Sequence, residues 1–126
     1  MNKDIENERM SDEPLFRVKT KLILQNREDF FGPGMSRLLH LIDEHGSIAA
    51  AAKEMEMAYS KAWKMLRKAE KGVAFPLILR EKGGKTGGGS KLTKEGKEFI
   101  ELYDEMQVEL KNYCEDLLKK YMDNYL

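Results

Sequence analysis

The 126-residue sequence has one cysteine, two histidines and no long apolar segment. A single cysteine cannot form a disulfide within the chain, which fits a reducing, cytoplasmic setting. One cysteine and two histidines also lack the four-ligand spacing of a structural zinc site. No apolar run approaches the roughly 20 residues of a membrane-spanning helix, and the polar, acidic start lacks the apolar region of a secretory signal peptide. We therefore expect a soluble globular protein without a metal or cofactor.

Net charge is also missing, because 22 basic residues balance 22 acidic ones. At face value this argues against a nucleic-acid partner. The charges are nevertheless unevenly distributed along the chain. Residues 60–97 hold 11 basic and 3 acidic side chains, a net charge of +8. Residues 98–126 hold 3 basic and 8 acidic side chains (−5), and residues 1–59 hold 8 basic and 11 acidic side chains (−3). A positive block this dense creates a local positive potential. A solvated surface is the alternative interpretation.

The start of the chain predicts a disordered tail followed by a β-hairpin. Residues 1–14 are polar and acidic, which is typical of disorder. From Leu15 to Leu24, apolar residues alternate with basic ones in the period-two pattern of a strand. A turn at 25–28 and a second short strand at 29–31 would complete the hairpin.

The next segment predicts a helix-turn-helix. A first helix runs from Met35 to His45, and Gly46 stands where a helix-ending glycine belongs. Ser47 is a good N-cap for a second helix, Ile48 to Met55. A third helix, at 59–71, follows after only three or four residues, which is the spacing of this motif.

The third helix is amphipathic. At about 100° per residue, its five basic residues fall within one arc of about 120°, opposite an apolar side that contains Trp63 and Leu66 and is expected to face the core. Glu70 is the misfit in this pattern. The basic side has no acidic residue, whereas exposed helices usually mix Glu with Lys, and this favours contact with nucleic acid. The basic residues are Lys61, Lys64, Arg67, Lys68 and Lys71.

Two strands, at 77–82 and 90–92, enclose a glycine-rich loop after the third helix. A helix-turn-helix followed by a basic hairpin predicts a winged helix, with helix 59–71 in the major groove and the wing, 83–90, on the flanking DNA backbone. The expected fold is mainly α with a small β component, comprising a domain at 15–93 and a long helix at 94–126.

That last helix, with Thr93 as a plausible N-cap, extends from Lys94 to about Met122. It would be roughly 43 Å long, against about 30 Å for a small domain. Its apolar residues recur at spacings of four and three, as in a coiled-coil seam, so we predict a homodimer. The alternative is that the helix folds back over the strands at 15–31. The seam consists of Phe99, Tyr103, Met106, Leu110, Tyr113 and Leu117.

Several local motifs occur together in this order: Gly32-Pro33-Gly34, Gly46-Ser47-Ile48, Ala51-Ala52-Lys53, Tyr59-x-x-Ala62-Trp63, and a Gly87-Gly88-Gly89 wing leading to Leu92-Thr93-x-x-Gly96. With these motifs the sequence resembles the N-terminal DNA-binding part of the ModE-type molybdate-dependent transcriptional regulators. LysR-type regulators share a looser form of the pattern and lack this wing.

The resemblance implies a bacterial, dimeric, winged-helix regulator of transcription that binds double-stranded DNA. Full-length members carry C-terminal oxyanion-binding modules, but this chain stops at Leu126. We therefore do not expect built-in molybdate sensing, and any sensor would be a separate protein. The residues expected to contact DNA are Ser47, Tyr59, Ser60, Lys61, Lys64, Arg67 and Lys68 in the helix-turn-helix, and Lys85, Thr86 and Lys91 in the wing.

Other functions find less support. Gly84-Lys85-Thr86 is not a phosphate-binding loop, because Leu79 stands where the pattern requires a glycine. No cluster has metal-ligand or catalytic spacing, so no catalytic residue or enzyme activity is predicted. Cys114 is expected to be a buried structural residue. The rival hypothesis is a protein-interaction module that uses the acidic C-terminal helix and does not bind DNA specifically.

Overall fold

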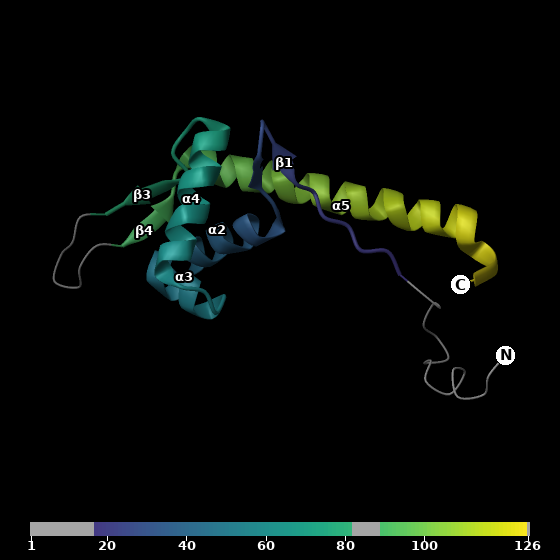
Figure 1. Cartoon of the computed structure of the whole chain (residues 1–126), viewed down its shortest axis with the longest axis horizontal. Helices are drawn as coiled ribbons and strands as arrows, with labels where there is room; N and C mark the ends of the chain where they lie inside the picture. Colours follow the sequence, from purple (N-terminus) through teal and green to yellow (C-terminus); the bar gives the residue numbers. More distant parts are fainter. Residues whose placement is uncertain (1–16, 82–88, 126) are drawn as a thin grey trace. The chain divides into compact units, whose positions relative to one another are not determined.

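The computed structural model describes residues 17–81 and 89–125, which form two compact units. The larger unit comprises residues 21–106, and residues 107–125 with 17–20 belong to the other. The chain is mainly helical (Figure 1), and its described residues form two antiparallel pairs of short strands. The predicted fold class is therefore confirmed. None of the helices described is long and apolar enough to cross a membrane.

The N-terminal hairpin exists, but its first strand is much shorter than predicted. Strand β1 (Leu24–Gln25) pairs antiparallel with β2 (Asp29–Phe31). The prediction of a strand over residues 15–24 was wrong for 17–23, which have no regular secondary structure, while 15 and 16 lie outside the described residues. The alternation itself was informative, since side chains along 17–24 are alternately exposed and half-buried.

Residues 17–23 follow the period-two pattern without forming a ladder, because the described residues provide no partner strand beside them. One contact instead comes from a helix: the hydroxyl of Tyr103 donates a hydrogen bond to the carbonyl of Leu22 at 2.7 Å. The alternation therefore indicated which side faces the protein, but not which element would cover it.

Helix α2 (Pro33–His45) begins two residues earlier than predicted. Proline suits the first turn of a helix because the amide hydrogen it lacks would have no partner there. Gly46 ends the helix in the left-handed conformation, with φ of 69°, and its N–H donates to the carbonyl of Ile42 at 2.8 Å. The side chains that α2 buries form the centre of the core, and they are Met35, Ser36, Leu38, Leu39, Leu41 and Ile42.

The helix-turn-helix consists of α3 (Ile48–Glu54) and α4 (Tyr59–Val73), which are separated by four residues. The hydroxyl of Ser47 accepts a hydrogen bond from the N–H of Ala50 at 3.1 Å, so the predicted N-cap is confirmed. In the turn, Glu56 adopts φ of 55°, a conformation that usually favours glycine. The N–H of the next residue, Met57, reaches back to the carbonyl of Ala52 at 3.0 Å and closes the turn.

The wing begins with β3 (Ile78–Arg80), which pairs antiparallel with β4 (Ser90–Leu92). The predicted strand at 77–82 is thus shorter at both ends, and residues 82–88, which contain most of the predicted glycine-rich loop, lie outside the described residues. The N–H of Ser90 donates to the carbonyl of Gly46 at 2.8 Å. This bond ties the wing to the corner between α2 and α3, close to the helix-turn-helix.

Glu70, the misfit in the helical pattern, has a structural role. Its carboxylate accepts hydrogen bonds from the N–H groups of Leu77 and Ile78, at 2.8 and 3.5 Å. Buried amide groups need such partners. The acidic residue on α4 therefore anchors the start of β3 and leaves the basic side of the helix without a carboxylate.

Helix α5 (Lys94–Met122) begins and ends as predicted. The hydroxyl of Thr93 accepts a hydrogen bond from the N–H of Gly96 at 2.8 Å, which confirms the N-cap. Phe31 of β2 packs edge-on against Phe99 and Tyr103, with ring centroids 4.9 and 4.8 Å apart. These first two seam positions therefore pack on the chain's own hairpin, which is the alternative considered for this helix.

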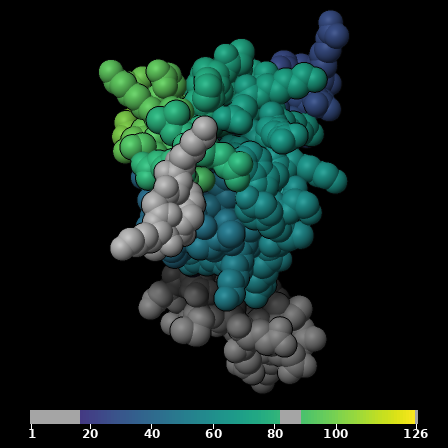
Figure 2. All heavy atoms as spheres, turned by 90° about the vertical axis from the view of Figure 1, so that its left-hand side faces the viewer, coloured from purple at the N-terminus to yellow at the C-terminus, as the bar shows by residue number. Residues whose placement is uncertain are grey.

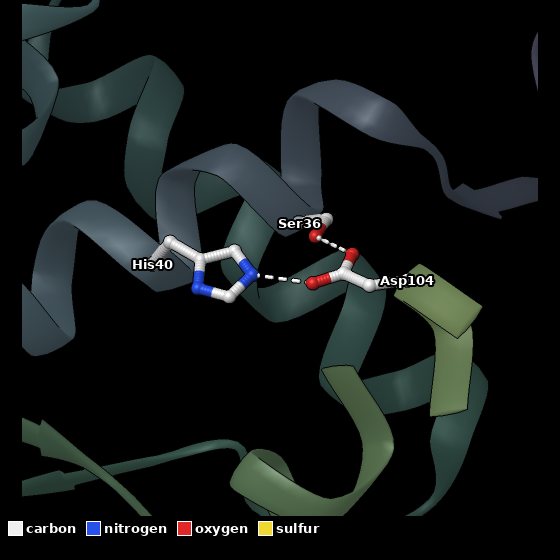
Figure 3. A network of polar contacts seen from close by, with 3 residues as sticks. All are labelled: Ser36, His40 and Asp104. Atoms are coloured by element: carbon white, nitrogen blue, oxygen red, sulfur yellow. Dashed lines mark hydrogen bonds and ion pairs between the residues drawn. The ribbon is translucent and has the colours of Figure 1, made fainter. Parts of the chain in front are cut away.

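A polar network joins α2 to α5 within the larger unit (Figure 3). The carboxylate of Asp104 accepts a hydrogen bond from the hydroxyl of Ser36 at 2.8 Å, and its other oxygen lies 2.6 Å from Nε2 of His40. Both partners are on α2, one helical turn apart. The network fixes the register of α5 against the first helix of the domain, and the carboxylate is shared between the two partners.

Candidate nucleic-acid interface

The basic side of α4 is exposed along its whole length. Its apolar side is buried, since Ala62, Leu66 and Ala69 belong to the core. Figure 2 shows the side chains of α4 standing out on one face of the molecule. Among the residues that the structure describes, no ion pair involves this side of the helix. We call it the basic face; it comprises Lys61, Lys64, Arg67, Lys68 and Lys71, all exposed.

At the N-terminal end of α4, the exposed Ser60 lies next to Tyr59, whose side chain is 46% exposed. The sequence predicted a DNA contact for Tyr59. In the structure its hydroxyl accepts a hydrogen bond from Nη2 of Arg80 at 3.3 Å, and its ring packs edge-on against Trp63. Tyr59 therefore joins the start of α4 to the end of β3.

Trp63 is half-buried and packs against the core, so its expected place in the core is only partly correct. The guanidinium of Arg80 lies 4.5 Å from the centroid of its ring, and that of Arg67 lies 5.8 Å away. Arginine stacks well on aromatic faces. Two cationic groups thus share one indole at the junction of α4 and β3.

Sequence reasoning missed Arg80 as a candidate. A signal was present, because side chains two residues apart in a strand share a face. Arg80 stands two residues after Ile78, which is buried. Its side chain therefore starts on the side of β3 that faces the helices, and its length carries the charge out to the rim of α4.

A cleft of about 540 Å³ continues the positive region at the other end of α4. Lys68 and Lys71 line one side, and Arg27 in the β1–β2 turn lines another. Glu28 is the only acidic residue among the described residues that line this cleft. Basic side chains thus extend from the N-terminal end of α4 to the hairpin.

The wing is less uniformly basic than the sequence suggested. The ammonium group of Lys91 lies 3.0 Å from a carboxylate oxygen of Glu81, and both side chains are mostly exposed. An exposed pair of this kind contributes little to stability and can exchange partners. Lys85 and Thr86, the other predicted wing contacts, lie outside the described residues.

The remaining polar candidates have local partners. Ser47 is half-buried and caps α3, although its hydroxyl hydrogen is still able to donate outward. His45 forms a hydrogen bond with Glu54 across the α2–α3 corner. Cys114, expected to be buried, is half-buried. Within the described part of the chain, no group of three potential metal ligands occurs.

Two helices joined by a tight turn, a basic outer face on the second helix and an antiparallel strand pair beside it define a winged helix-turn-helix protein. A family model described as "Bacterial regulatory helix-turn-helix protein, lysR family" matches residues 35–97, half of the chain. The chain therefore belongs to the lysR family of bacterial regulatory helix-turn-helix proteins.

Individual relatives refine this placement. The transcriptional regulator ModE of Haemophilus influenzae is 41% identical over 75 residues, which cover 60% of this chain and 29% of that protein. The molybdenum transport protein ModE of Azotobacter vinelandii is 32% identical over 84 residues, covering 67% of this chain and 31% of that protein. The resemblance to ModE-type regulators is thus confirmed, and the chain spans less than a third of these relatives' lengths.

A solved structure of a LysR family transcriptional regulator superposes with a TM-score of 0.52 at 21% sequence identity. The match covers 69% of this chain and 28% of that one. At this level of identity the likeness supports the fold alone.

Proposed function

We propose that this protein is a transcriptional regulator that binds double-stranded DNA through α4 and the wing. The observation that carries the proposal is the basic face of α4, which is exposed, free of carboxylates and placed on the second helix of a helix-turn-helix. The second helix of this motif enters the major groove, and its N-terminal residues contact the base edges. Membership of a family of bacterial regulatory proteins supports the same function.

The exposed residues of α4 divide between two tasks in this proposal. We assign Ser60, at the start of α4, to the base edges on the floor of the groove. We assign the lysines of the helix to the phosphate backbone: Lys61 and Lys64 near its start, and Lys68 and Lys71 near its end, where Arg27 lines the same cleft. Phosphate contacts give most of the affinity and make it depend on salt, whereas base contacts give specificity.

Salt-dependent DNA binding tests this function. We expect the wild-type protein to bind a pool of random-sequence duplexes with an affinity that falls steeply between 50 and 200 mM salt, on the scale usual for six to ten phosphate contacts. Replacing Lys61 and Lys64 together by alanine should weaken binding and lower the slope of log affinity against log salt by up to about two units. Fluorescence anisotropy of labelled duplexes measures both quantities.

A matched control removes two lysines from α5, Lys111→Ala and Lys119→Ala, so that the net charge changes by the same amount. This variant should retain the wild-type slope. Equal affinity of the Lys61/Lys64 variant and the wild type for the duplex pool would refute the proposed interface. Loss of all DNA binding, together with a stable protein partner, would favour the rival interaction module.

We propose further that the protein is a homodimer joined through α5. Met106 and Tyr113, two seam positions, are 47% and 63% exposed, and Leu102 is 61% exposed. At about 100° per residue these three side chains fall within about 40° of one another on the helix. An exposed, continuous apolar stripe of this kind marks a protein–protein contact surface. A second copy of the chain carries the same stripe and can pack against it. Leu110 and Leu117, both half-buried, border it.

The oligomeric state checks this proposal directly. Light scattering at micromolar concentration should give about 29 kDa, twice the chain mass of 14.6 kDa. Met106→Glu with Tyr113→Glu should give a monomer, because both changes place charge on the stripe. The control, Lys111→Glu, alters charge on the opposite side of α5 and should remain dimeric. A wild-type protein of monomeric mass would refute the dimer.

A further inference from the structure

The strongest unassigned feature of the molecule is the contact between β3 and the N-terminal end of α4. There Arg80, Trp63 and Tyr59 form a cluster, in which the guanidinium stacks over the indole at 4.5 Å and donates to the tyrosine hydroxyl at 3.3 Å. The sequence assigned Trp63 to the core and gave Arg80 no role. The cluster is exposed at two of its three members, since both Tyr59 and Arg80 are solvent-accessible.

We propose that this cluster, the Arg80 clamp, is a DNA-binding element that presents a preoriented guanidinium beside the start of the recognition helix. The inference rests on the proposed function and adds to it a residue outside both the basic face and the predicted wing contacts. The clamp comes from β3, yet its charge lies at the end of α4 that enters the major groove in this motif.

The first argument concerns orientation. A free arginine side chain has many rotamers, and ordering it on binding costs entropy. In the clamp the guanidinium lies over the indole, and one of its terminal nitrogens donates to the Tyr59 hydroxyl. The backbone of Arg80 is fixed as well, because it pairs with Ser90 in the β3–β4 ladder. A group held in this way loses little freedom when it binds, so its hydrogen bonds contribute more fully to affinity.

The second argument concerns charge. Arg80 and Arg67 both lie over Trp63, and within residues 17–81 and 89–125 neither is paired with a carboxylate. The next residue, Glu81, pairs with Lys91. Two guanidinium groups sharing one aromatic ring without an anion raise the local positive potential. An incoming anion would relieve this repulsion.

The third argument concerns the chemistry of the ligand. A guanidinium has five N–H donors in a planar fork, and in the clamp one terminal nitrogen uses a donor on Tyr59. The fork suits a pair of acceptor atoms at fixed spacing. DNA offers two such pairs: two oxygens of a backbone phosphate, and O6 with N7 of guanine in the major groove. The clamp fits either pair, and lysine, a point charge, cannot reproduce the geometry.

The test uses Arg80→Lys, which keeps the positive charge and removes the planar arrangement of N–H donors. Duplexes are first enriched from a random-sequence library with the wild-type protein. Arg80→Lys should then bind the enriched duplexes about tenfold more weakly, while the salt slope stays unchanged because the charge is retained. Arg37→Lys is the matched control, since Arg37 is exposed on α2 outside the basic face, and it should stay within about twofold of the wild type.

A repeated selection with Arg80→Lys separates the two acceptors. If Arg80 reads a guanine, the variant should lose the preference at one base position. If it binds a phosphate, affinity should fall by the same factor on every sequence. Binding of Arg80→Lys within twofold of the wild type would overturn the clamp, while the Lys61/Lys64 result would still decide the proposed function. Absence of DNA binding by the wild type would overturn both.

The single tryptophan gives a readout that does not depend on affinity. Because Trp63 lies under the clamp, bound DNA should shield its emission from acrylamide, and quenching should fall when the enriched duplex is saturating. Unchanged quenching at saturation would place the clamp away from the DNA and contradict the inference. Thermal unfolding of Arg80→Lys, followed by circular dichroism, shows whether a loss of affinity reflects binding or loss of the fold.

Discussion

Replacing Gly72 by alanine should destabilise the protein by about 2–3 kcal/mol, the upper range for overpacking a core. Gly72 lies near the end of α4, where Gly→Ala would ordinarily stabilise a helix by about 0.5–1 kcal/mol. A Cβ atom at this position would lie 2.1 Å from Cδ2 and 2.2 Å from Cγ of Phe30. Phe30 belongs to β2 and packs against the core. The ring cannot move aside without disturbing the hairpin, so the helix or the strand must shift.

The same substitution at Gly34 is the matched control. Gly34 is exposed in the first turn of α2, and a Cβ there would meet only the terminal methyl group of Met65 at an ordinary 3.9 Å. Gly34→Ala should therefore be neutral or stabilising, by up to about 1 kcal/mol. Urea unfolding measures both variants. Equal effects of the two changes would show that helix propensity, and not the contact with Phe30, governs Gly72.

Between pH 10 and pH 12 the protein should lose about 2 kcal/mol of stability through Tyr103 alone, out of the roughly 3 kcal/mol to which two pKa units correspond. Burial raises the pKa of Tyr103 to about 12, and the negative charge of the neighbouring Asp104 adds to the shift. The side chain is only 2% exposed. Because the folded state holds the phenolic proton more tightly than the unfolded state, this stability is fully present below pH 10. It is lost as the pH rises towards 12.

Tyr103→Phe isolates this effect. The variant loses the hydrogen bond to the carbonyl of Leu22, at a cost of about 1 kcal/mol at neutral pH. It also lacks the titrating group, so its stability should fall less than that of the wild type above pH 10. The two proteins should become similar in stability near pH 11, when both are followed by urea unfolding. Parallel pH profiles would show that Tyr103 does not control alkaline stability.

These two sites and the candidate interface depend on the same packing. Gly72 allows α4 to lie against β2, and Tyr103 holds α5 against the segment before β1. Between them, α4 is fixed with its apolar side inward and its basic face outward. Changes at Gly72 or Tyr103 should therefore affect DNA binding only through loss of the folded state, whereas changes at Lys61, Lys64 or Arg80 should affect it without loss of stability.

The sequence alone determined the helices, because the residues that start, end and orient a helix lie close together in the sequence. Caps at Ser47 and Thr93, the helix-ending Gly46 and the 3.6-residue period predicted the helices to within two residues. The same period separated the basic face of α4 from its buried side. These features depend on residues a few positions apart, so they are visible without the fold.

Only the tertiary structure decided which distant segments meet. It showed that Glu70 anchors the start of β3, that Glu81 pairs with Lys91, and that Phe99 and Tyr103 pack on the chain's own hairpin. It also brought Arg80 onto Trp63, 17 positions earlier in the sequence. All four contacts have the same physical reason. Side-chain type and period predict which face of a helix or strand is buried, but the packing of the whole domain decides which element covers that face.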